Sequence, residues 1–184
     1  MEHNPNFQDT QGTSTLLEHN VTSVEDLVAP GNDYIAPSSS FFFAPEPQQT
    51  SAMRFLPSKP IADRLLARYW ESVHYMCRIL HRPSFEREYA SLWQNVATGS
   101  EPKPPLQALV LATMLSAVIS MSEEEILLEF EVAKPDLLEN FQRGTETALY
   151  KANFLRSTKL QTLQAFVMYL VSSAMFVLLV DHGY

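Results

Sequence analysis

The segment 106–121 sets the strongest limit on what this chain can fold into. Its sequence, LQALVLATMLSAVISM, contains no charged residue and is apolar nearly all round a helix. A helix of this kind is stable only when other elements cover most of its circumference. We therefore expect an all-α protein in which this helix is buried on most sides.

The preceding segment, 56–93, has the pattern of two amphipathic helices. Pro60 and Asp63 suit the first turn, because the φ of proline is already helical and an acid stabilises the positive end of the helix dipole. We expect this first helix to stop at His81-Arg82-Pro83, since the residue before a proline avoids the α region. The stripe of this helix that is predicted to be buried consists of Ala62, Leu65, Leu66, Tyr69, Trp70, Val73, Met76, Cys77 and Leu80. The face predicted to be exposed to solvent consists of Asp63, Arg64, Arg68, Glu71, Ser72 and Arg78.

A second helix is predicted directly after Pro83. Ser84 is the expected N-cap, with Glu86 and Glu88 near the positive end of the helix. The predicted apolar side consists of Phe85, Tyr89, Leu92, Trp93 and Val96. The two helices together predict a hairpin with a tight elbow at 81–84.

Several short motifs in this region occur in the order and spacing of a known family. They are Leu56-Pro57, Ala62-Asp63-Arg64-Leu65-Leu66, Tyr69, Val73-His74, Ile79-Leu80-His81-Arg82-Pro83-Ser84-Phe85 and Tyr89. The pattern resembles the opening of the fungal-specific transcription factor domain, the middle homology region of fungal zinc-cluster transcription factors. One departure is Met76-Cys77-Arg78, where the family often has an aromatic residue and a proline; it concerns the local turn and not the assignment.

This resemblance implies a nuclear, non-enzymatic role in the regulation of transcription. The family reads DNA through a binuclear zinc cluster held by six cysteines, whereas this chain contains one cysteine, Cys77. We therefore expect no direct DNA binding by that route, and action through self-association or a related transcription factor instead. In the family the domain continues for roughly another hundred residues, so residues 54–184 are interpreted as its N-terminal half.

The charge of the chain is uneven. Its net charge is −8, which gives no reason to expect binding to DNA or to an anionic membrane. Residues 1–57 hold seven acids and one base. Residues 1–53 are also rich in Asn, Gln, Ser, Thr and Pro, and we predict a disordered acidic tail. Its apolar islands at 24–28 and 41–45 resemble activation segments that fold onto coactivators, although a tail without that role is the simpler alternative.

Three further helices are predicted after residue 121. Ser122 and Glu125 form a capping box, with Met121 and Ile126 at the positions of a hydrophobic staple. This helix continues through Phe130. The next one starts at Pro135 and is weakened by Gly144, which costs about 1 kcal/mol relative to alanine. Its predicted buried face is Leu137, Leu138, Phe141, Thr145, Ala148, Leu149 and Ala152.

The last helix is predicted over 160–180, after a second capping box formed by Thr158 and Gln161. Leu163-Gln164 resembles a block of the family in which a Leu-Gln pair opens a long apolar helix. Residues 163–180 reach the lower length limit of a membrane span. Because Gln164, Ser172 and Ser173 interrupt the run and few basic residues flank it, we expect a core helix. In a partial domain this helix would leave an exposed apolar face that tends to bind other proteins or aggregate.

No catalytic, cofactor or metal site is predicted. His74, Cys77 and His81 carry zinc-ligating atoms at i, i+3 and i+7, but a structural zinc site needs four closely arranged ligands, and a half-buried histidine at the turn is the better interpretation. Glu71-x-x-His74 is half of a di-iron motif with no second half on an inward face. The glycines are single and scattered, whereas a phosphate-binding loop needs clustered glycines, so no such loop is predicted.

We therefore predict an irregular antiparallel array of five or six helices behind a disordered tail. The predicted function is transcription regulation by a chain that lacks its own zinc cluster. The alternative is an inactive truncated remnant, or a helical interaction protein without regulatory activity.

Overall fold

The computed structural model describes residues 51–181, with side chains through residue 175, and every regular element in that range is helical. The predicted all-α fold is confirmed. Residues 1–50 of the predicted tail, with its two apolar islands, lie outside the described residues. Its last residues do not, because Ala52 and Met53 form part of a 3₁₀ turn in which Ala52 is buried.

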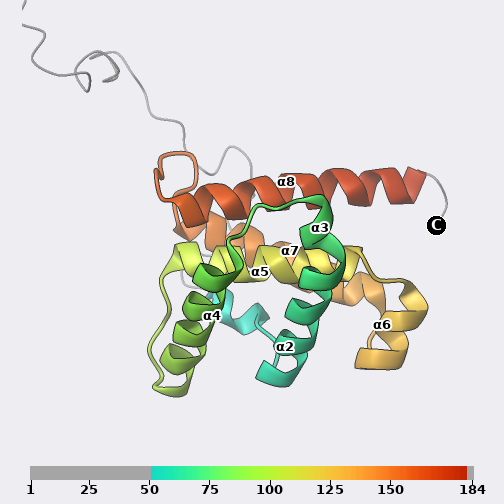
Figure 1. The fold of residues 1–184 in the computed structure, drawn as a ribbon, viewed down its shortest axis with the longest axis horizontal. Helices are drawn as coiled ribbons and strands as arrows, with labels where there is room; N and C mark the ends of the chain where they lie inside the picture. The colour runs from blue at the N-terminus through green and yellow to red at the C-terminus, as the bar shows by residue number, and fades with distance from the viewer. Residues whose placement is uncertain (1–50, 182–184) are drawn as a thin grey trace, which may run out of the picture. The chain divides into compact units, whose positions relative to one another are not determined.

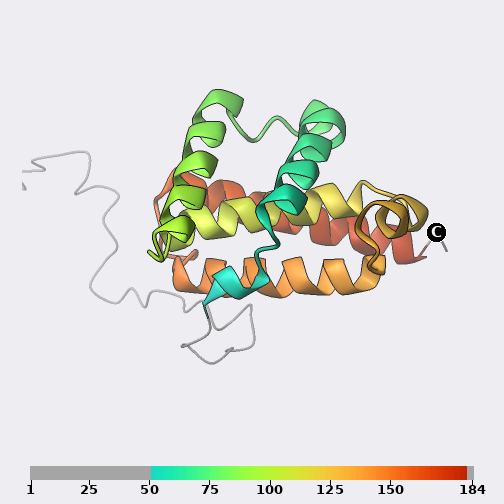
Figure 2. The ribbon, with the colours of Figure 1, turned by 90° about the horizontal axis from the view of Figure 1, so that it is seen from below.

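Helix α5, Pro104–Ile119, lies at the centre of the described helices. It packs along α7 (Lys134–Lys151) and α8 (Leu160–Asp181), and α7 runs antiparallel to both, as Figures 1 and 2 show. The remaining faces of α5 are covered by the elements that precede it in the chain. Every residue of α5 from Pro105 to Val118 is buried, as its uncharged, apolar sequence predicts.

The first arm of the predicted hairpin is α2 (Lys59–Arg68), followed by a π-helical turn η3 (Tyr69–Val73) and a short α3 (His74–Met76). Pro60 lies in the first turn of α2 as predicted. The stripe is buried from Ala62 through Trp70, but Met76 is 72% exposed, so its predicted burial is wrong. In the π turn the His74 N–H donates a hydrogen bond to the Tyr69 carbonyl. This turn contains one residue more than an α-helical turn, so α3 is rotated away from the register of α2.

The prediction of a tight elbow at 81–84 is also wrong. The chain leaves the helix at Cys77, four residues earlier than predicted, and the extended link 77–81 leads into α4, Arg82–Ala97. Leu80 anchors the link in the core, and the Gln164 Nε2 of α8 donates a hydrogen bond of 2.7 Å to the Ile79 carbonyl. Burial of the link therefore outweighs continuation of the helix.

The N-cap of α4 is His81 rather than Ser84. His81 has extended backbone angles, and Arg82 and Pro83 form the first two helical positions, where proline's missing N–H costs nothing. The Ser84 hydroxyl lies 2.9 Å from Nδ1 of His81, one turn away. The cap prediction thus misplaced the start of the helix by three residues.

Aromatic rings join the two arms of the hairpin. The Trp70 and Phe85 ring centroids are 5.8 Å apart, and the Tyr89 hydroxyl donates a 2.8 Å hydrogen bond to Asp63. Burial acts to raise the pKa of Asp63, but hydrogen bonds from Lys59 and Tyr89 outweigh it and hold the pKa below its ordinary value. Of the predicted apolar side of α4, Phe85, Tyr89 and Leu92 are buried and Trp93 half-buried, whereas Val96 is exposed on an open groove beside Pro57 and Pro102.

Helix α6, Glu123–Phe130, confirms the predicted capping box. The Glu125 N–H donates to the Ser122 hydroxyl at 3.1 Å, and the Ser122 N–H donates to the Glu125 carboxylate at 2.7 Å. Both proposed staple residues, Met121 and Ile126, are buried. The helix ends where Glu131 adopts a left-handed φ of 56°.

Gly144 of α7 is buried against the 3₁₀ turn η2, Ala52–Phe55. A Cβ on Gly144 would lie 2.7 Å from the Phe55 Cβ. The Asn140 side chain of the same helix donates a 2.9 Å hydrogen bond to the Phe55 carbonyl and fixes the turn there. Glycine at this position is therefore a packing requirement, and interpreting it only as a weak point of the helix was incomplete.

Candidate interaction surface

Helix α8 has one face inside the described core. Ala165, Met168 and Ser172 are buried on it, and the Ser172 hydroxyl lies 2.9 Å from that of Ser116 on α5. The Tyr169 hydroxyl donates to the Glu146 carboxylate of α7. Burial, reinforced by this hydrogen bond, raises the pKa of Tyr169 to about 12. These contacts fix the rotation of α8 about its own axis.

The opposite side of α8, here called the α8 face, is apolar and exposed. Its large side chains are between 40% and 69% exposed, although no ionisable group other than Tyr169 occurs from Leu160 to Val180. Together their exposed fractions equal about three fully exposed apolar side chains, whose burial is worth roughly 4–9 kcal/mol at most. The exposed apolar face predicted for the last helix is thus present. It consists of Leu160, Leu163, Val167, Leu170, Val171 and Met175.

Other large apolar side chains that are exposed in the described part occur singly or in pairs. Tyr75 and Met76 lie at the end of α3, and Leu127 and Leu128 lie on α6. Such isolated residues are usual on protein surfaces, whereas a row along a whole helix indicates an interaction site. The α8 face is therefore the candidate functional surface of the described residues.

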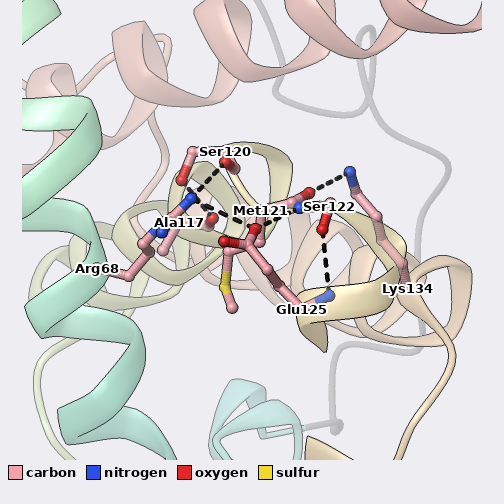
Figure 3. A network of polar contacts seen from close by, with 7 residues as sticks. All are labelled: Arg68, Ala117, Ser120, Met121, Ser122, Glu125 and Lys134. Atoms are coloured by element: carbon pink, nitrogen blue, oxygen red, sulfur yellow. Dashed lines mark hydrogen bonds and ion pairs between the residues drawn. The ribbon is translucent and has the colours of Figure 1, made fainter. Parts of the chain in front are cut away.

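A polar joint holds α2, α5, α6 and α7 together at the end of α5 (Figure 3). The Arg68 guanidinium donates to the Ser120 carbonyl at 3.0 Å and lies 3.5 Å from Glu125, and Lys134 donates to the Met121 carbonyl at 2.6 Å. These cations satisfy carbonyl groups near the negative end of the α5 dipole. Arg68 is half-buried, so its assignment to the solvent face is wrong, because α6 folds back over it.

The hairpin arginines do not form a free basic stripe. Arg64 donates to the Glu129 carbonyl at 3.1 Å and its guanidinium lies 4.8 Å from the Phe130 ring centroid. Arg82 pairs with Glu86 at 2.7 Å. Phosphate contacts by these groups would have to compete with contacts that they already make.

The residues considered for zinc and for iron are spread over different surroundings. His74 packs edge-on against Trp70 with ring centroids 4.9 Å apart, His81 is exposed beside Ser84, and Cys77 is half-buried. Glu71 is exposed. Among the side chains that the structure describes, 51–175, no three His, Cys, Asp or Glu groups are placed so that they could hold a metal ion.

The α8 face could be predicted only in part from the sequence. The uncharged run identified the helix, but apolar residues lie on every side of it, so the spacing of Leu160, Leu163, Val167 and Leu170 does not distinguish the outward row from the buried one. The polar joint had a weaker signal, because nothing local connects Arg68 with the end of α5.

Among residues 51–175, whose side chains the structure describes, no single helix has both the length and the apolar character needed to cross a membrane; the part of α8 in that range, Leu160–Met175, is apolar but too short. Helices α5 and α6 reach the threshold only as a pair, and the chain bends by 118° between them.

Comparison with known proteins gives one family and several relatives. The model of the fungal specific transcription factor domain matches residues 66–177. The aurofusarin cluster transcription factor aurR2 of Gibberella zeae is 37% identical over 119 residues, 63% of this chain and 17% of that protein. The C6 finger domain transcription factor hasF of Aspergillus fumigatus is 31% identical over 122 residues, 58% of this chain and 16% of that protein.

A third relative aligns over most of the chain. The pyriculol/pyriculariol biosynthesis cluster transcription factor 1 of Pyricularia oryzae is 25% identical over 171 residues, 90% of this chain and 22% of that protein. The chain thus spans less than a quarter of the length of each of these relatives. No solved structure matches it.

Proposed function

Because the chain belongs to the fungal-specific transcription factor domain family, we propose that it regulates transcription in the nucleus through protein contacts and does not read DNA itself. A role in transcription regulation is supported by the family and by relatives that are named transcription factors rather than enzymes. The proposal concerns how these residues carry out that role. The alternative is a remnant, or an interaction module, without regulatory activity.

The observation that carries the proposal is the α8 face. A row of half-exposed Leu, Val and Met side chains along one helix is costly to leave in water and is typical of a surface that a protein partner covers. A second copy of the chain and a related transcription factor are the two partner classes considered.

Charge supports the absence of direct DNA reading by these residues. Phosphate neutralisation by Lys and Arg supplies essentially all of non-specific DNA affinity, and this chain carries 21 acids and 13 bases. Its single cysteine cannot form the six-cysteine cluster that the family uses. Arg64, Arg68 and Arg82 are already engaged within the described helices.

The regulatory role is tested by tethering. The chain is fused to a heterologous DNA-binding module in a fungal strain that carries the matching reporter gene. We expect the fusion to change reporter expression relative to the DNA-binding module alone. Equal expression from the two, at equal protein levels, would support the remnant alternative.

DNA binding is tested separately with the untethered chain. A gel-shift assay against random duplex DNA at low salt is expected to show no complex at micromolar protein. A strong shift that disappears on adding salt would overturn this half of the proposal, because it would reveal phosphate contacts. Arg78 and Arg87, which are exposed on the hairpin, would then be the first residues to substitute.

A further inference from the structure

We propose that the α8 face binds a second copy of this chain, α8 against α8, in a two-fold symmetric dimer. This inference rests on the proposed function and specifies its partner. An isologous contact uses the same patch on both copies, so the patch must be complementary to itself in shape and charge.

The spacing along α8 meets the requirement on shape. Leu160, Leu163, Val167, Leu170 and Ala174 are all exposed and are separated along the chain by intervals of three, four, three and four residues. This alternation is the seam of a two-helix coiled coil, in which the side chains of one helix fit between those of its partner. The small Ala174 permits a close approach of the helix backbones.

Charge meets the second requirement. The α8 face contains no Asp, Glu, Lys or Arg, so two copies meet without like-charge repulsion at the contact. Charged residues flanking a seam normally select a different partner and fix its orientation. Residues 160–180 carry none, so no charge along this part of α8 selects against the pairing of identical helices, even though the chain as a whole is acidic.

The size of the face limits the strength of this dimer. The exposed row from Leu160 to Met175 is about 24 Å long at 1.5 Å per residue. One helix face of that length buries less than the roughly 800 Å² per partner of a standard interface. We therefore expect a reversible dimer whose dissociation constant lies in the micromolar range.

The experiment is sedimentation equilibrium of the full chain from about 1 to 200 μM. The mass is expected to rise with concentration from 20.9 kDa towards twice that value. Leu170→Glu is expected to raise the dissociation constant at least about 100-fold, because a symmetric contact would bury two unpaired carboxylates. The matched control is Leu128→Glu, the same change at the 87% exposed Leu128 of α6, which should leave the dimer intact.

A cross-link tests the position of the contact. In a Cys77→Ser background, Val167→Cys places a thiol at the middle of the α8 face, where each copy meets itself in either helix orientation. It should form a disulfide-linked dimer on mild oxidation, since bonding requires Cα atoms within about 7 Å. Val132→Cys, at a residue of similar exposure outside α8, is the control and should not.

Several outcomes would overturn the dimer. They are a wild-type chain that stays monomeric at 200 μM, one that forms open-ended aggregates instead of dimers, and equal effects of the Leu170→Glu and Leu128→Glu changes. Circular dichroism of each variant shows whether it is folded, and the wild-type measurement remains decisive if one is not. The tethered reporter separates the two ideas: an active fusion of a monomeric chain rejects only the dimer, and a silent fusion of a dimeric chain rejects only the regulatory role.

Discussion

Replacing Gly144 with alanine should destabilise the protein, although the same change stabilises most helices. Helix propensity alone favours alanine over glycine by about 1 kcal/mol in a helix interior. In this chain the new Cβ would lie 2.7 Å from Cβ and 3.0 Å from Cγ of Phe55, and 3.3 Å from a Leu111 methyl group. Carbon atoms in van der Waals contact are normally about 3.5–4.0 Å apart.

The sign depends on whether Phe55 can move. Its ring is buried and its carbonyl accepts the hydrogen bond from Asn140, so the turn that carries it is held from both sides. Overpacking of such a site costs about 1–3 kcal/mol, and the upper part of that range applies because the atom in the way is a Cβ. We expect a net loss of about 1–2 kcal/mol in the free energy of unfolding, or a fall of about 2–8 °C in Tm.

Urea denaturation followed by far-ultraviolet circular dichroism measures the change. Phe55→Gly provides the matched background, because it removes both atoms closest to the new methyl group. There Gly144→Ala should become stabilising by up to about 1 kcal/mol. Both chains can be compared in a stabilising osmolyte if Phe55→Gly weakens the fold too far. Stabilisation by Gly144→Ala in the wild-type chain, or the same effect in both backgrounds, would refute the packing argument.

Further substitutions test the core, the polar joint and one charged group, all by urea denaturation. Trp70→Ala should cost about 3–5 kcal/mol because Trp70 is only 8% exposed, and a loss below about 1 kcal/mol would contradict the buried stripe. Arg68→Ala should cost about 1–2 kcal/mol, more than a surface change, because the Ser120 carbonyl loses its donor. Ser122→Ala should cost about 1 kcal/mol by removing the cap of α6, whereas no loss would mean that the capping box contributes nothing. Since the folded-state pKa of Asp63 is lowered, its stabilisation is present above the unfolded pKa of about 3.8 and is lost as the pH falls below it, so Asp63→Asn should destabilise at pH 7 and much less at pH 3.

Local patterns predicted which segments are helical and most of what they bury. The buried α5 required only an uncharged segment without a polar side, and the start of α6 required only Ser122 and Glu125 at the right spacing. The family could be identified from short motifs around Ala62 and Ile79. These signals lie within a few residues of one another, so the chain itself encodes them wherever its helices pack.

The mistakes share a different origin. The π turn that exposes Met76, the early exit of the chain at Cys77 and the half-burial of Arg68 depend on neighbours that are distant in the sequence. Gly144 is required by Phe55, which lies 89 residues earlier in the chain. A pattern that reports only the periodicity of its own segment contains no information about such partners.

The candidate surface shows the same division. The uncharged run from Leu160 to Val180 is enough to predict that α8 is a long apolar helix, but a helix that is apolar on every side has no preferred rotation. Its hydroxyl contact with α5 at Ser172 and the link between Tyr169 and Glu146 decide that Ala165 and Met168 face the core and that Leu163, Val167 and Leu170 face outward. Hydrophobic burial is non-directional, so only specific polar contacts and shape in the tertiary structure select the face that remains exposed.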